Sequence, residues 1–153
     1  MRIAALLLAA LLLSACALRL PAAPPPLPTP TPTPDPVALF LARYEAMEAL
    51  YNALAAQLET FAFDSPEWRG ETIRLAQRWR AAIEKLQETP QPAGANWSAA
   101  WPVLQEALGE YLYVAGAVES AATANDPTLL GTARGRLVDG VDLMYEAMRL
   151  LEE

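Results

Sequence analysis

From Val37 onward, apolar side chains recur at alternating spacings of three and four residues, which is the period of an amphipathic helix. We call each such row of positions on one face of a helix a seam. The first seam consists of Phe40, Tyr44, Met47, Tyr51, Leu54, Leu58 and Phe61. The second consists of Trp68, Thr72, Leu75, Trp79, Ala82 and Leu86. The third consists of Trp101, Leu104, Leu108, Tyr111, Ala115, Val118 and Ala122. The fourth consists of Leu130, Arg134, Leu137, Val141, Met144, Met148 and Leu151.

Capping residues and prolines separate these seams. Ser65 followed by Pro66 is a typical helix start, and Pro90 and Pro92 lie in a stretch that cannot remain helical. We therefore expect helices over about 37–62, 66–88, 98–124 and 127–152. Short connections place consecutive helices side by side and antiparallel. The pattern predicts an all-α protein, with an antiparallel up-down-up-down four-helix bundle over residues 37–153.

The first sixteen residues have the pattern of an export signal. Arg2 precedes the unbroken apolar stretch 3–13, which is shorter than the roughly 20 residues that a membrane-spanning helix needs. Leu13-Ser14-Ala15-Cys16 then resembles the lipobox of bacterial lipoproteins. That resemblance implies removal of residues 1–15 and lipid attachment at Cys16. It also implies export and anchoring to a cell-envelope membrane, without indicating whether the cytoplasmic or the outer one.

Two other interpretations of this segment are open. Ala15-Cys16-Ala17 also fits a small-residue cleavage site, which would release the chain without lipid. Alternatively, Cys16 is an incidental residue of an uncleaved anchor. Durable attachment needs more than one acyl chain, and a lipidated Cys16 would supply several.

The segment that follows Cys16 is rich in proline and threonine. Within residues 16–36, proline fixes the backbone and removes amide donors, which favours an extended spacer that holds the domain away from the membrane. Docking of a proline-binding domain is one alternative. Glycosylation is the other, at Thr29, Thr31 and Thr33.

Composition removes several kinds of chemistry. The chain has no histidine and one cysteine, so it lacks the commonest general base and metal ligand and cannot form an intrachain disulfide. A net charge of −7 argues against nucleic-acid binding. Glutamates pair at helical spacing but off the seams, which indicates a solvated face: Glu45 with Glu48, Glu67 with Glu71, and Glu106 with Glu110. We expect no enzyme activity, cofactor or metal site.

Arg134 and four glycines interrupt the helical pattern. Arg134 lies on the apolar seam of the fourth helix, and its expected partner is Glu119, with contact to an anionic ligand as the alternative. Mid-helix glycine is unfavourable by about 1 kcal/mol relative to alanine. Close packing of the third and fourth helices is the expected reason, and a groove is the alternative, for Gly109, Gly116, Gly131 and Gly135.

Some aromatic residues lie outside the seams. Trp97, Tyr113, Tyr145 and Phe63 would mark a partner surface if they proved exposed and contiguous, whereas seam aromatics are more often core. The sequence favours a non-enzymatic bundle that binds another envelope protein, not identified, or has a structural role. The alternative is a small-molecule-binding or sensory bundle with a site between helices.

Overall fold

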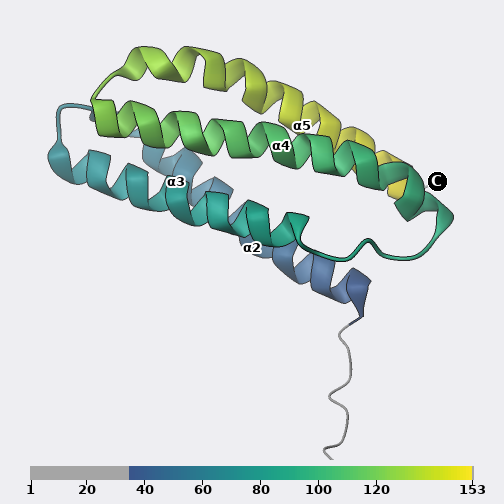
Figure 1. Cartoon of the computed structure of the whole chain (residues 1–153). Coiled ribbons are helices and arrows are strands. Elements are labelled where there is room, and N and C mark those ends of the chain that lie inside the picture. Colours follow the sequence, from purple (N-terminus) through teal and green to yellow (C-terminus); the bar gives the residue numbers. More distant parts are fainter. Residues whose placement is uncertain (1–34, 153) are drawn as a thin grey trace, which may run out of the picture. The chain divides into compact units, whose positions relative to one another are not determined.

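The computed structural model describes residues 35–152, which form four α-helices and one 3₁₀ turn (Figure 1). These are α2 (Pro36–Glu59), α3 (Pro66–Gln87), α4 (Ala95–Ala124), η2 (Pro127–Leu129) and α5 (Leu130–Glu152). The prediction of an all-α helical bundle is confirmed. Within residues 35–152, no helix has the length and apolar character needed to cross a membrane. Cys16 and residues 1–34 lie outside the described residues, so the signal peptide, the lipid and the spacer stay predictions.

Side-chain caps and turn conformations set the helix ends. The Asp35 carboxylate accepts from the Val37 amide at 3.1 Å, and the Ser65 hydroxyl accepts from the Trp68 amide at 3.1 Å. α4 begins at Ala95, three residues earlier than expected. It begins there because Gly94 has a φ of 133°, a conformation that glycine tolerates and other residues rarely adopt.

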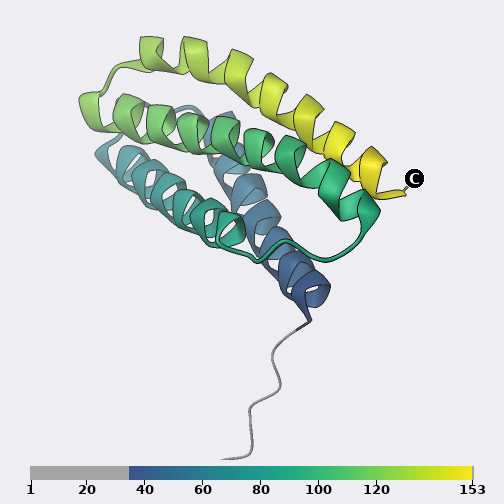
Figure 2. The same cartoon turned by 45° about the vertical axis from the view of Figure 1, so that its right-hand side comes forward.

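Consecutive helices pack side by side and run antiparallel (Figures 1 and 2). At one end, the Asn96 side chain donates to the Leu151 carbonyl at 3.3 Å. At the other end, the Arg69 guanidinium donates to the Phe63 carbonyl at 2.6 Å and to Asn125 Oδ1 at 3.2 Å. The first and last helices differ from the consecutive pairs, because the backbones of α2 and α5 make no close approach to each other. The described bundle is therefore open along that side.

The predicted seams form the core with few exceptions. Apart from Pro92 of the loop between α3 and α4, the largest wholly buried side chains come from α2, α3 and α4, and include Trp79, Phe40, Ile83, Leu86, Leu104 and Leu108. Two seam residues are exposed. Phe61 has 55% of its surface exposed, because α2 ends at Glu59 before the seam reaches it, and Arg134 is exposed on α5. Phe63 is buried instead, in a small cluster with Trp68 and Ala121.

Glycine packing differs from the expectation. A Cβ added at Gly109, Gly131 or Gly135 would meet nothing within 4 Å, so close helix packing does not explain these three glycines. Gly140, on α5, has that role: an added Cβ would lie 2.8 Å from the Tyr111 ring of α4. The absence of a side chain at Gly140 therefore allows the Tyr111 ring to approach α5 closely.

Candidate functional site: a groove between α2 and α5

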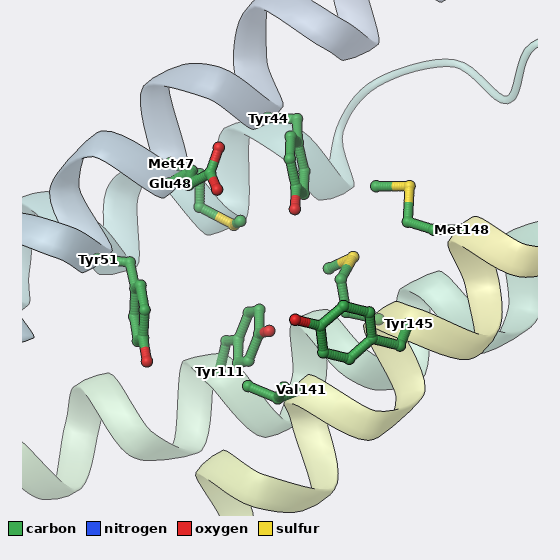
Figure 3. Close-up of a pocket in the computed structure, with 9 residues that line it drawn as sticks. Tyr44, Met47, Glu48, Tyr51, Tyr111, Val141, Tyr145 and Met148 are labelled. Carbon is green, nitrogen blue, oxygen red and sulfur yellow. The ribbon is translucent and has the colours of Figure 1, made fainter.

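A cavity of about 320 Å³ lies between α2 and α5, with α4 as its floor (Figure 3). Four tyrosines, three methionines, one valine and one glutamate line it. These residues are Tyr44, Met47, Glu48, Tyr51, Tyr111, Val141, Met144, Tyr145 and Met148. We call this cavity the tyrosine groove. Within the part of the chain that the structure describes, Glu48 is the only charged side chain of the lining.

Helical spacing brings these side chains to one place. On α2, Tyr44, Met47 and Tyr51 are separated by three and four residues, and therefore share a face. On α5, Val141, Met144 and Met148 do the same. Tyr111 reaches the groove from α4, between these two walls. The groove is thus built from ordinary seam positions whose opposing helix stands apart.

The tyrosine hydroxyls face shared space instead of protein acceptors. Figure 3 shows the hydroxyls of Tyr44, Tyr111 and Tyr145 pointing toward one another. Within residues 35–152, none of the four lining tyrosines has a hydrogen-bond partner for its hydroxyl. Tyr111 is buried, Tyr44 and Tyr51 are half-buried, and Tyr145 is 73% exposed at the mouth. Polar atoms in a partly enclosed cavity are thus available to water or a ligand.

The pKa values of two groove phenols, those of Tyr44 and Tyr111, are raised. Burial raises the pKa of Tyr44, and the negative charge of Glu48 and the proximity of Tyr145 raise it further. Burial also raises the pKa of Tyr111, with smaller contributions from Tyr44, Tyr51 and Tyr145. Each direction follows from the cost of forming a phenolate away from water or near another negative group. Tyr44 and Tyr111 are therefore neutral phenols at neutral pH.

A second, smaller cavity continues along the same side of the bundle. It measures about 60 Å³, and Tyr51, Leu54, Leu58, Trp79 and Leu137 are among the residues that line it. The Trp79 ring centroid lies 5.6 Å from those of both Tyr51 and Tyr111. The buried indole nitrogen of Trp79 has no hydrogen-bond partner among the described residues. The ring distances place the Trp79 indole in direct contact with Tyr51 and Tyr111 of the groove.

The predicted pairing of Arg134 with Glu119 is wrong. Glu119 forms its ion pair with Arg80 of α3 at 2.6 Å, and also accepts from Gln77 at 2.8 Å. Gly116 leaves room for the Arg80 side chain, because an added Cβ there would lie 3.3 Å from the Arg80 guanidinium. Arg134 is exposed on α5. Glu119 thus faces α3, so the two residues form no joint site.

The proposed partner surface does not come together as one patch. Trp97 is half-buried, with its ring centroid 5.1 Å from that of Phe40. Tyr113 is 46% exposed and lies under the Arg136 guanidinium, 5.1 Å from its carbon to the ring centroid. Tyr113 and Tyr145 line different cavities, so only Tyr145 belongs to the tyrosine groove.

The paired glutamates also take separate roles. Glu48 lines the groove, Glu71 pairs with Arg74 on its own helix, and Glu110 pairs with Arg136 at 2.7 Å. Among residues 35–152, no three histidine, cysteine, aspartate or glutamate side chains gather as a possible metal site. The carboxylates of this part of the chain therefore act singly or in ion pairs.

Sequence reasoning assigned most of the groove to the core. Tyr44, Tyr51 and Tyr111, with three methionines, lie on the apolar seams and were expected to be packed inside. A signal was present in the residue types: four of the five tyrosines of the chain line this groove. The three methionines are those at positions 47, 144 and 148, which are all the methionines of the described residues.

Comparisons with protein-family models, with curated proteins and with solved structures find no match. The function has to be argued from the groove itself.

Proposed function

We propose that this protein is a membrane-anchored binding module of the cell envelope, which holds a small molecule between α2 and α5. The observation that carries the binding proposal is the partly enclosed tyrosine groove, whose four hydroxyls have no hydrogen-bond partner within residues 35–152. Support for the anchor comes from the lipobox-like residues that end at Cys16. The proposed role is binding, without catalysis.

The dimensions and lining of the groove fit a small ligand. Sites for small molecules are concave, have volumes of roughly 300–1,000 Å³, and combine an apolar lining with a few convergent polar groups. At about 320 Å³, the tyrosine groove is at the lower end of that range. Thioethers of Met47 and Met144 are flexible and polarisable, so they adapt to the shape of an apolar ligand. Recognition of a compact molecule is therefore favoured over docking of a protein partner.

Three aromatic probes of similar shape and different charge test this function: phenyltrimethylammonium, tert-butylbenzene and benzenesulfonate. The full chain with Cys16→Ser is titrated with each probe while tryptophan fluorescence is recorded, because Trp79 contacts Tyr51 and Tyr111. We expect saturable binding of at least one probe. Val141→Trp fills the groove and should weaken that binding about tenfold or more.

Val138→Trp is the matched control, because Val138 lies on the same helix, is exposed and does not line the groove. It should retain the affinity of the parent chain. Absence of saturable binding for all three probes would refute the proposed function, as would equal losses in the two tryptophan variants. Mass spectrometry of the mature wild-type chain tests the anchor, which requires an acylated N-terminal Cys16.

A further inference from the structure

The charge of the ligand can be argued from the composition of the groove wall. Among the described residues, its lining contains four aromatic rings, three thioethers, one carboxylate and no basic side chain. The faces of aromatic rings carry partial negative charge, which attracts cations. The carboxylate and the ring faces therefore have the same sign, and they favour a positively charged occupant.

The position of Glu48 adds to the preference for a positively charged ligand. Figure 3 shows Glu48 on the α2 wall beside Tyr44, whose hydroxyl points into the groove. The Glu48 carboxylate is exposed at the groove and, like those of Glu45 and Glu106, has no ion-pair partner among residues 35–152. Burial is the main cause of the raised pKa of the Tyr44 phenol, and the negative charge of Glu48 raises it further, as expected for a carboxylate close to this wall. A cationic ligand in the groove could therefore form an ion pair with Glu48.

The type of cation follows from what the lining can offer in place of water. Hard inorganic cations need several oxygen ligands, and a single carboxylate with four neutral phenols is a weak set for them. An ammonium group that carries carbon substituents is weakly hydrated and contacts aromatic faces directly. Tyr111 at the floor and Tyr44 and Tyr145 at the sides provide aromatic rings for such contacts, and their hydroxyl oxygens point into the same space.

We propose that the tyrosine groove selects organic ammonium cations, with the cationic group among Tyr44, Tyr111 and Tyr145 and next to Glu48. This inference rests on the proposed binding function and specifies its ligand class. The recognised feature is a substituted ammonium head of compact size, whatever molecule carries it.

The same three probes separate charge from shape. Phenyltrimethylammonium and tert-butylbenzene have the same skeleton, and differ in a charged nitrogen in place of a carbon. In the full chain with Cys16→Ser, we expect the cation to bind about tenfold or more tightly than the neutral probe, and the anion most weakly. Isothermal titration calorimetry gives the three dissociation constants.

Two variants locate the effect. Glu48→Gln should weaken binding of phenyltrimethylammonium about two- to fivefold, as expected for a partly solvated charge, and leave tert-butylbenzene unchanged. Glu45→Gln is its matched control, because it removes one charge from the same helix outside the lining. Tyr145→Leu should cause a similar loss for the cation, whereas Tyr113→Leu, outside the groove, should not.

The outcomes distinguish this inference from the function on which it rests. Equal or tighter binding of the neutral or anionic probe, blocked by Val141→Trp, would overturn the cation inference and leave the binding function standing. Equal effects of Glu48→Gln and Glu45→Gln would also overturn it, because they would reflect net charge alone. Failure of all three probes would remove both proposals.

Discussion

Trp68 and Trp79 lie on the same apolar seam of α3 and are both buried, yet only one indole N–H has an acceptor. Trp68 Nε1 donates to the Gln57 carbonyl and to the Thr60 hydroxyl, each at 3.0 Å. Trp79 Nε1 has no partner in the described part of the chain. Buried donors without partners are rare because each one lowers the free energy of unfolding.

The two tryptophans belong to regions that are built differently. Around Trp68, at the turn between α2 and α3, aromatic rings pack together and their polar atoms are satisfied within the protein. Around Trp79, the neighbouring rings are Tyr51 and Tyr111, whose hydroxyls lack protein partners. The indole N–H of the turn region is thus hydrogen-bonded within the protein, whereas the tyrosine groove has polar groups that can bind water or a ligand. The two regions therefore differ in how far the protein itself satisfies their polar groups.

The largest expected effect comes from filling the space that Gly140 leaves for Tyr111. Gly140→Ala places a Cβ within 2.8 Å of the ring, and should lower the free energy of unfolding by about 1–3 kcal/mol, as overpacking typically does. Urea unfolding followed by circular dichroism measures the change.

Gly135→Ala is the control for this substitution on the same helix. An added Cβ there meets nothing within 4 Å, so the gain in helix propensity should raise the stability by about 0.5–1 kcal/mol. Equal effects of the two alanines would show that Gly140 has no special role in placing Tyr111.

A smaller loss is expected at the turn region. Thr60→Val removes an acceptor for the Trp68 indole and a donor to the Gln57 carbonyl at 2.7 Å. We expect a decrease in the free energy of unfolding of about 1 kcal/mol, with unchanged binding of phenyltrimethylammonium. A decrease in affinity instead would contradict the separation between the two regions.

The smallest effect on stability is expected in the groove. Tyr111→Phe deletes a hydroxyl that has no protein partner, so at neutral pH the free energy of unfolding should change by less than about 0.5 kcal/mol. The variant should differ at alkaline pH, where the raised pKa of Tyr111 matters. Above pH 10 the unfolded chain ionises this phenol and the folded chain does not, so the parent loses stability as pH rises.

Tyr111→Phe should remove part of that alkaline loss, as measured by urea unfolding at a series of pH values. Parallel curves for the parent and the variant would indicate that Tyr111 is not shielded from water as the structure describes. Tyr113→Phe, at an exposed position of the same helix, provides the comparison.

Helix positions could be predicted because each depends on local signals. Ser65 and Pro66 start α3, and most seam residues are buried as the period requires. Two helix starts differ from the prediction. The 3₁₀ turn η2 precedes α5, and α4 starts early, directly after Gly94. These details depend on backbone conformations at one or two residues.

The groove could not be predicted, because periodicity identifies the apolar face of a helix and not the distance to the helix opposite. Tyr44 and Tyr51 satisfy the seam pattern whether α5 is packed against them or stands apart. The Arg134 assignment failed for a related reason, since the sequence does not say which neighbouring helix Glu119 faces. Spatial neighbours across non-consecutive helices require the three-dimensional structure.

The open side of the bundle has a mechanical consequence. Among the helices of residues 35–152, α3 is the only one whose backbone packs against α2. The opposite wall of the groove, α5, packs against α4 (Figure 2). If the chain is tethered through the residues that precede Asp35, tension on the tether pulls directly on α2, and so on one wall of the groove. A ligand that contacts both α2 and α5 would resist that displacement. Under this condition, tension on the tether would lower the affinity for the ligand, and a bound ligand would raise the force needed to move α2.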